Sequence, residues 1–160
     1  MIVVADTSPL NYFVLIREIE LLPGLFGQVI IPHAVWAELH APGTPLVVRE
    51  WADSAPSWLE VRTASFIDPG IKLGLGEAEA ICLAAELHAD QLLVDDGKAR
   101  RIAIALGLAV VGTLNILEAA SMRDMVDLPH AIRGLQQTNF RAPADLVKLL
   151  LDRDAERRTR

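Results

Sequence analysis

The chain lacks the features that mark several large classes of protein. Its 160 residues include one cysteine, Cys82, so no internal disulfide can form, which suits a reducing compartment. No apolar run approaches the roughly 20 residues that cross a bilayer, and no positively charged leader precedes the first apolar run. From these absences we expect a cytoplasmic protein that is not anchored in a membrane.

Sequence motifs for common cofactors are also missing. The chain has neither Gly-x-Gly-x-x-Gly after its first apolar run nor a P-loop pattern, which argues against nucleotide sites of those kinds. Its four histidines show no zinc-binding spacing. A phosphatase or phosphotransferase with Asp6 as nucleophile is a weak hypothesis, because Ser8 stands where the Asp-x-Asp pattern of such enzymes needs a second aspartate.

Positive charge is scarce in the first part of the chain. Residues 1–97 carry four Lys or Arg against 14 Asp or Glu, whereas residues 98–160 carry 11 against seven. An acidic site beside a more basic half is typical of a metal-dependent enzyme that acts on a polyanion. The simpler alternative is a surface of uneven charge.

What the chain does contain is an alternation of short apolar runs with helical stretches, which predicts a parallel α/β sheet in a single domain, 1–160. We expect strands at 2–5, 29–31, 91–95 and 109–111, and either a short strand or an edge extension at 58–63. Ser8 should cap a helix that runs to about Ile16. Further helices are expected at 18–25, from Pro32 through Leu39, and at 46–54, 77–89, 98–106, 114–124, 129–138 and 143–158.

Carboxylates recur where these strands would end. Asp6 closes the first strand, Asp95 and Asp96 close the fourth, and Glu38 and Glu77 lie on helices between them. Ligands gather at the carboxyl ends of parallel strands. Carboxylates brought together there repel one another unless a cation holds them charged. The sequence therefore predicts a divalent metal site, and Mg²⁺ or Mn²⁺ suits its oxygen ligands.

Each acid also has a structural interpretation. Asp6 could be a turn residue, and Glu38 could be a solvated glutamate. Helix dipoles favour acids in a first turn; of Glu77 and Glu79, we expect only Glu77 to point inward. One of the two adjacent aspartates should bind metal directly, while the other acts through water or caps a helix. Polar neighbours that could position water or phosphate are Ser8, Asn11, Lys98, Arg100 and Arg101.

Several motifs together resemble the PIN-domain nucleases, in an order and spacing that fit across residues 1–125. They are Val4-Ala5-Asp6-Thr7-Ser8-Pro9-Leu10, Ile30-Ile31-Pro32 leading to Ala37-Glu38-Leu39, Leu75-Gly76-Glu77-Ala78-Glu79-Ala80-Ile81, and Leu92-Leu93-Val94-Asp95-Asp96. Gly112-Thr113 matches the Gly-Thr that ends the fourth strand of one bacterial and archaeal subfamily, which adds Thr113 to the positioning residues.

The resemblance implies a three-layer α/β/α sandwich around a parallel sheet, with acids that bind Mg²⁺ or Mn²⁺ and with single-stranded RNA as the usual substrate. Asp6, Glu38, Glu77 and Asp96 fall on the family's acidic pattern. Val94-Asp95 stands where many members have Thr or Ser before the last aspartate, so Asp95 and Asp96 both remain candidate ligands. Glu77 replaces a commoner aspartate.

The leading hypothesis is a metal-dependent endoribonuclease of the VapC type, the toxin of a toxin–antitoxin pair. The family implies a homodimer and a cognate antitoxin as partners. The alternative is a catalytically silent PIN-like module that binds RNA or protein.

Overall fold

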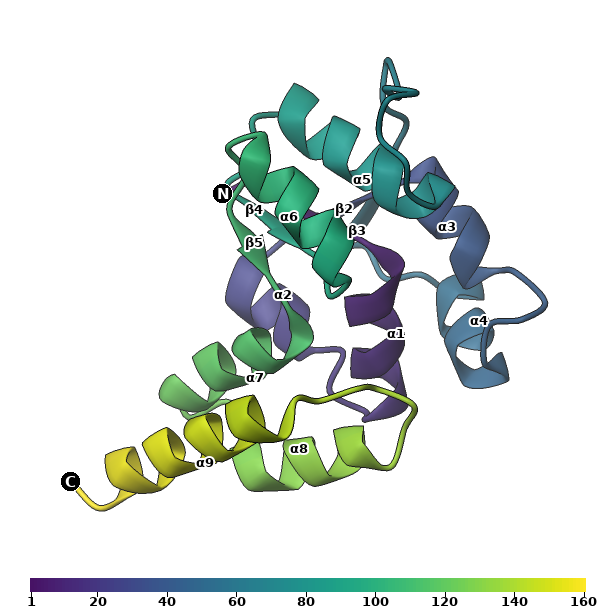
Figure 1. The fold of residues 1–160 in the computed structure, drawn as a ribbon. Coiled ribbons are helices and arrows are strands. Elements are labelled where there is room, and N and C mark those ends of the chain that lie inside the picture. Colours follow the sequence, from purple (N-terminus) through teal and green to yellow (C-terminus); the bar gives the residue numbers. More distant parts are fainter.

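A five-stranded parallel sheet forms the centre of the molecule, in a computed structural model that describes residues 1–160 (Figure 1). The strand order is β3-β2-β1-β4-β5. From β1 the chain moves outward to β2 and β3, then returns to place β4 on the other side of β1. The carboxyl ends of β1 and β4 therefore meet at a topological switch point, which is where open α/β sheets bind ligands. The strands are β1 (Val3–Ala5), β2 (Val29–Pro32), β3 (Leu59–Arg62), β4 (Gln91–Leu93) and β5 (Val110–Val111).

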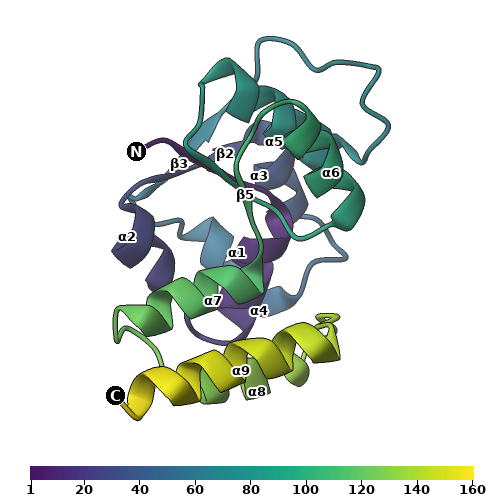
Figure 2. The same ribbon diagram turned by 60° about the vertical axis from the view of Figure 1, so that its left-hand side comes forward.

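Helices cover both faces of the sheet, so the fold is the expected α/β/α sandwich (Figures 1 and 2). Before β4 the chain forms α1 (Thr7–Leu15), α2 (Leu21–Phe26), α3 (His33–Leu39), α4 (Leu46–Asp53) and α5 (Leu75–Glu86). After it come α6 (Gly97–Ala105), α7 (Thr113–Met122), α8 (Leu128–Gln136) and α9 (Ala144–Arg158). No helix is long and apolar enough to cross a membrane.

The strands divide their side chains between two cores, because successive residues of a strand face opposite sides. Val3 and Ala5 of β1 belong to a core of 24 buried residues that includes side chains of α1, α7, α8 and α9. Val4 between them belongs to a smaller core with α5 and α6. The three C-terminal helices thus complete the larger core. They lie together on the face opposite α5 and α6 (Figure 2).

Helix boundaries differ from the sequence-based expectation at two places that bear on the acids. Asp6, not Ser8, occupies the N-cap position, and α1 begins at Thr7. Helix α5 begins at Leu75 and contains Gly76, which was expected to precede it. Gly76 is buried because the carboxylate of Glu38 lies over it; a Cβ there would come within 2.7 Å of the Glu38 Cδ atom. The glycine therefore admits a side chain from α3.

Candidate active site

Asp6 lies at the centre of the acids, at the switch point of the sheet. Its backbone N–H donates to the Leu93 carbonyl at 2.9 Å, which joins the ends of β1 and β4. The side chain is 4% exposed, and its Oδ1 atom is buried without a hydrogen-bond partner. The pKa of Asp6 is raised to about 7, chiefly by burial and further by the charges of Glu77, Glu38 and Asp95, against a lowering backbone hydrogen bond at Thr7. An aspartate in these surroundings is stabilised either by keeping its proton or by binding a cation.

Glu38 and Glu77 face Asp6 from α3 and α5. The Glu38 carboxylate accepts a hydrogen bond from the Thr7 hydroxyl, directly after Asp6. Glu77 is half-buried, and burial raises its pKa, followed by the charges of Asp96 and Glu38. Electrostatic coupling thus links Asp6 to Glu77, Glu38 and Asp95 and links Glu77 to Asp96, although no three of these acids lie close enough together to form a ready metal site.

Asp95 and Asp96 have different local roles. Asp95 accepts two hydrogen bonds from Thr113, from its backbone N–H and from its hydroxyl, each at 2.7 Å. Burial raises the pKa of Asp95, while these bonds and the charge of Arg100 lower it. Asp96 caps α6, because its Oδ2 accepts from the Ala99 N–H at 2.9 Å. One aspartate caps a helix, as expected, and both stay candidate ligands.

Glu79 is the acid that sequence reasoning placed wrongly. We expected Glu77 alone to point inward, but Glu79 is more deeply buried, at 3% exposure. Its carboxylate accepts from the backbone N–H groups of Ala34 at 2.8 Å and Ala64 at 3.0 Å. It therefore fastens the start of α3 to the segment after β3. The spacing in the sequence carried this signal, because Glu79 lies three residues after Gly76 and four before Leu83, on one face of the helix. The structure buries that face.

The acids suit a divalent cation by their chemistry, although no three of them converge into a finished metal cage. Three are held by hydrogen bonds, Glu38 by Thr7, Asp95 by Thr113 and Asp96 by the Ala99 N–H. The donors are all carboxylate oxygens, which Mg²⁺ and Mn²⁺ prefer. The unpartnered Oδ1 of Asp6 and the raised pKa values of Asp6 and Glu77 both indicate charge that a cation would compensate.

A cavity of about 430 Å³ opens beside Asp95 and Asp96. Of the expected positioning residues, Ser8, Arg100 and Thr113 line it. Asn11 and Arg101 do not, and the Lys98 ammonium instead donates to the Lys72 carbonyl at 2.9 Å. The rest of the lining comes from α1, from α7 and its N-cap Gly112, from Leu146 of α9, and from the segment between α8 and α9, which the sequence did not associate with the site.

A family model described as a PIN domain matches residues 2–156. The chain belongs to the PIN-domain family. PIN domains are generally nucleases, so the family supports a nuclease-like protein. A PilT N-terminus domain protein from the hyperthermophilic archaeon Sulfolobus solfataricus P2 has a similar structure, with a TM-score of 0.56 and 23% identity over 75% of this chain and 93% of that one. That likeness concerns the fold. The comparison with curated proteins gives no match.

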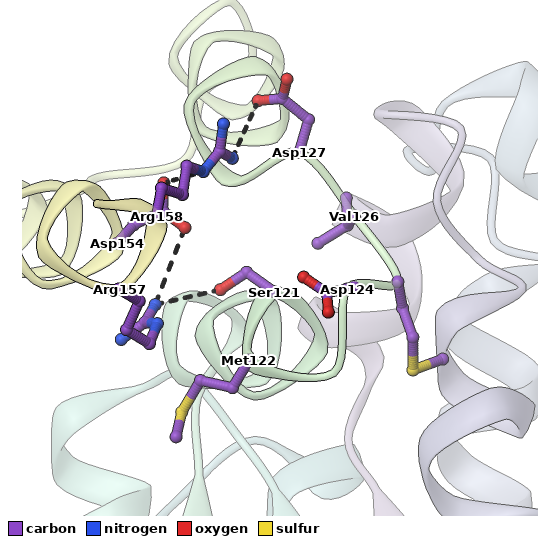
Figure 3. A pocket seen from close by; sticks show the side chains of 9 residues that line it. Ser121, Met122, Asp124, Val126, Asp127, Asp154, Arg157 and Arg158 are labelled. Carbon is purple, nitrogen blue, oxygen red and sulfur yellow. Dashed lines mark hydrogen bonds and ion pairs between the residues drawn. The ribbon is translucent and has the colours of Figure 1, made fainter. Parts of the chain in front are cut away.

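This PIN domain has a larger cavity, of about 580 Å³, at the opposite end of α7 from Thr113 (Figure 3). Asp127, Asp154, Arg157 and Arg158 of its lining form ion pairs, whereas Asp124 forms none. Asp154 of α9 lies 3.0 Å from Arg158 and 3.7 Å from Arg157, and Arg158 also reaches Asp127 at 3.8 Å. The Arg157 guanidinium donates to the Ser121 hydroxyl at 3.3 Å. These contacts join α7, α8 and α9, so this region holds the C-terminal helices together.

Proposed function

We propose that this PIN domain is a divalent-metal-dependent endoribonuclease that cleaves single-stranded RNA in the cytoplasm. One observation carries the proposal: Asp6 is buried at the switch point with an unpartnered oxygen and with Glu38, Glu77 and Asp95 around it. A buried aspartate with a purely structural role normally has hydrogen-bond partners for both carboxylate oxygens. Asp6 instead has carboxylates as charged neighbours, an arrangement typical of a cation site.

Asp6, Glu38, Glu77 and Asp96, with Asp95, are the residues that would hold Mg²⁺ or Mn²⁺. When bound, such a cation stabilises negative charge on phosphate oxygens and makes water a stronger acid near neutral pH. Thr7 and Thr113 orient two of the carboxylates through their hydroxyl groups. Arg100 lines the neighbouring cavity without an ion pair to any carboxylate, so its guanidinium is available to a phosphate.

The test is cleavage of a mixed single-stranded RNA by the purified full-length chain in Mg²⁺, in Mn²⁺ and in EDTA. We expect cleavage only with metal. Asp6→Asn should lower the rate by about a hundredfold or more, since the cation is worth several kcal/mol to the transition state. Asp154→Asn makes the same change at the same burial, far from the site, and should cleave like the parent.

Two results would overturn the proposal. One is a folded parent that cuts no RNA with either metal, which would favour the catalytically silent binding module. The other is an Asp6→Asn variant, folded by circular dichroism, that cleaves at the parent's rate. Cleavage that needs no metal would contradict the role of the cation but not the ribonuclease activity itself.

We further propose that the protein acts as the toxin of a toxin–antitoxin pair and forms a homodimer. The family resemblance supports this role. Expression of the parent, but not of Asp6→Asn, should arrest growth of a bacterial host, and co-expression of the neighbouring gene should relieve the arrest. Growth unaffected by the active nuclease would contradict the toxin role, and a monomeric mass by light scattering would contradict the homodimer.

A further inference from the structure

The cavity beside Asp95 has an aromatic wall that the acidic site does not use. Tyr12 of α1 and Phe140 of the segment between α8 and α9 contact each other edge to face, with ring centroids 4.9 Å apart. Both side chains are half-buried and both line the cavity. Phe140 therefore joins the last two helices to the helix that follows Asp6. An aromatic pair at the rim of an acidic cleft has a surface to offer a flat ligand.

Hydrogen bonds hold this wall in place. The Tyr12 hydroxyl donates to the Asn139 Oδ1 at 2.8 Å, and the Phe140 N–H donates to the Thr138 hydroxyl at 3.1 Å. The Thr138 hydroxyl in turn donates to the Leu135 carbonyl at the end of α8. Because Asn139 uses its oxygen on Tyr12, its amide N–H groups stay free. Asn115, on α7, lines the same cavity with a second side-chain amide.

Two arginines of the cavity have no carboxylate partner. Arg100 and Arg141 both line it, and neither forms an ion pair within 4.0 Å. In the α7–α9 cavity, by contrast, Arg157 and Arg158 are each paired with acids. Other arginines outside the cavity also form no ion pair, so what bears on a ligand is that Arg100 and Arg141 both line this cavity, with the charge of Arg100 acting on Asp95. The guanidinium groups of these two arginines suit a phosphate.

We propose that this cavity is a nucleotide-binding subsite for the RNA nucleotide next to the scissile phosphate. Its base stacks on Phe140, with Tyr12 supporting the ring, and the amides of Asn139 and Asn115 donate to the base edge. Arg100 and Arg141 hold the adjoining phosphates. The cavity, of about 430 Å³, lies within the usual size of ligand pockets. The inference rests on the proposed ribonuclease function and names how that site holds its substrate.

The decisive experiment removes a nucleobase from the RNA and the Phe140 ring from the protein, first separately and then together. A short single-stranded RNA that the parent cuts at one position is remade with an abasic nucleotide at each position in turn. For the parent, we expect one abasic position beside the cut to lower kcat/KM about tenfold, the size of one lost stacking contact. Phe140→Leu should show that loss with intact RNA and lose less than about twofold more when the same base is removed.

Binding gives a second readout that does not need catalysis. Affinity of each protein for the intact RNA in EDTA is measured by fluorescence anisotropy at several salt concentrations. Arg141→Gln, an exposed position where folding is not at risk, should reduce the slope of log affinity against log salt by about 0.7. Phe66→Leu and Arg123→Gln change exposed residues outside the cavity and should behave like the parent in both assays.

The outcomes separate the two proposals. If the parent cuts RNA with metal but base removal and Phe140→Leu act additively at every position, the subsite is refuted and the ribonuclease stands. An unchanged salt slope in Arg141→Gln would also count against the subsite. If a folded parent neither binds nor cuts RNA, the proposed function fails and the subsite fails with it.

Discussion

Two aspartates of this molecule are equally buried and have opposite surroundings. Asp6 at the end of β1 and Asp154 on α9 are each 4% exposed. Asp154 lies among arginines, with Arg158 at 3.0 Å. Asp6 has an oxygen without a partner and three carboxylates as its charged neighbours. Burial is thus the same in both regions, and the sign of the surrounding charge differs.

The difference separates a structural region from the candidate functional site. Removing a carboxylate from water is unfavourable, and a nearby arginine offsets that effect. The α7–α9 region contains this compensation within the chain, so its acids stabilise the folded state as it stands. Around Asp6, the charges of Arg100 and Lys98 offset burial only in part, at Asp95 and Glu77, so a cation from outside would stabilise the charged state of these acids. Unfavourable electrostatics in a folded protein are typical of sites that bind something.

The largest expected effect is a gain of stability when the charge of Asp6 is removed. The folded state keeps the Asp6 proton up to about pH 7, whereas the unfolded chain releases it near 3.8. The unfolding free energy therefore falls as pH rises between these values. Above pH 7 in EDTA, Asp6→Asn should be more stable than the parent by on the order of 4 kcal/mol. The gain should vanish below about pH 4, as measured by urea denaturation across pH.

A variant less stable than the parent at pH 8 would contradict this account of Asp6. Asp145→Asn, at an exposed aspartate that forms no ion pair or side-chain hydrogen bond, is the control for the substitution itself.

The same substitution at Asp154, which is paired with arginines, should lower the free energy of unfolding instead of raising it. Asp154→Asn removes the charge that holds Arg157 and Arg158, and we expect a loss of about 2 kcal/mol, the scale of a hydrogen bond to a charged group. Urea denaturation at pH 8 measures it beside Asp6→Asn. If the two variants changed the free energy of unfolding by the same amount in the same direction, the contrast between the two regions would be wrong.

The smallest expected effect comes from added metal. At ten times its dissociation constant, Mg²⁺ or Mn²⁺ should raise the unfolding free energy of the parent by about 1.4 kcal/mol, because it binds the folded state. The gain should disappear in Asp6→Asn and persist in Asp154→Asn. Thermal melting with and without metal measures it. A gain that survives in Asp6→Asn would place the cation elsewhere.

Much of the fold was predictable because its signals are local. Short apolar runs gave the strands in order, and β3 had been expected at 58–63 with looser bounds. Asp6, Glu38, Glu77 and the pair Asp95–Asp96 were selected from their places in this pattern, and the family resemblance pointed to Asp96 within that pair. Their proximity follows from topology, since parallel strands bring their carboxyl ends to one edge.

The side-chain partners of the buried acids could not be predicted from the sequence in the same way. Glu79 binds N–H groups of Ala34 and Ala64, which lie 45 and 15 residues away. Lys98 follows the Asp95–Asp96 pair closely in sequence, yet its ammonium donates to the Lys72 carbonyl. Such contacts depend on how loops and helices pack, and no local pattern encodes them.

The sequence by itself determined the α/β/α class, the strand order of appearance and the gathering of acids at strand ends, because periodicity and strand termini depend on neighbours along the chain. Only the tertiary structure decided that one oxygen of Asp6 lacks a partner while Asp154 has two arginines, and that Phe140 lines the same cavity as Asp95 across 45 residues of chain. Burial and charge compensation depend on distances in space, and these exist only once the helices have packed.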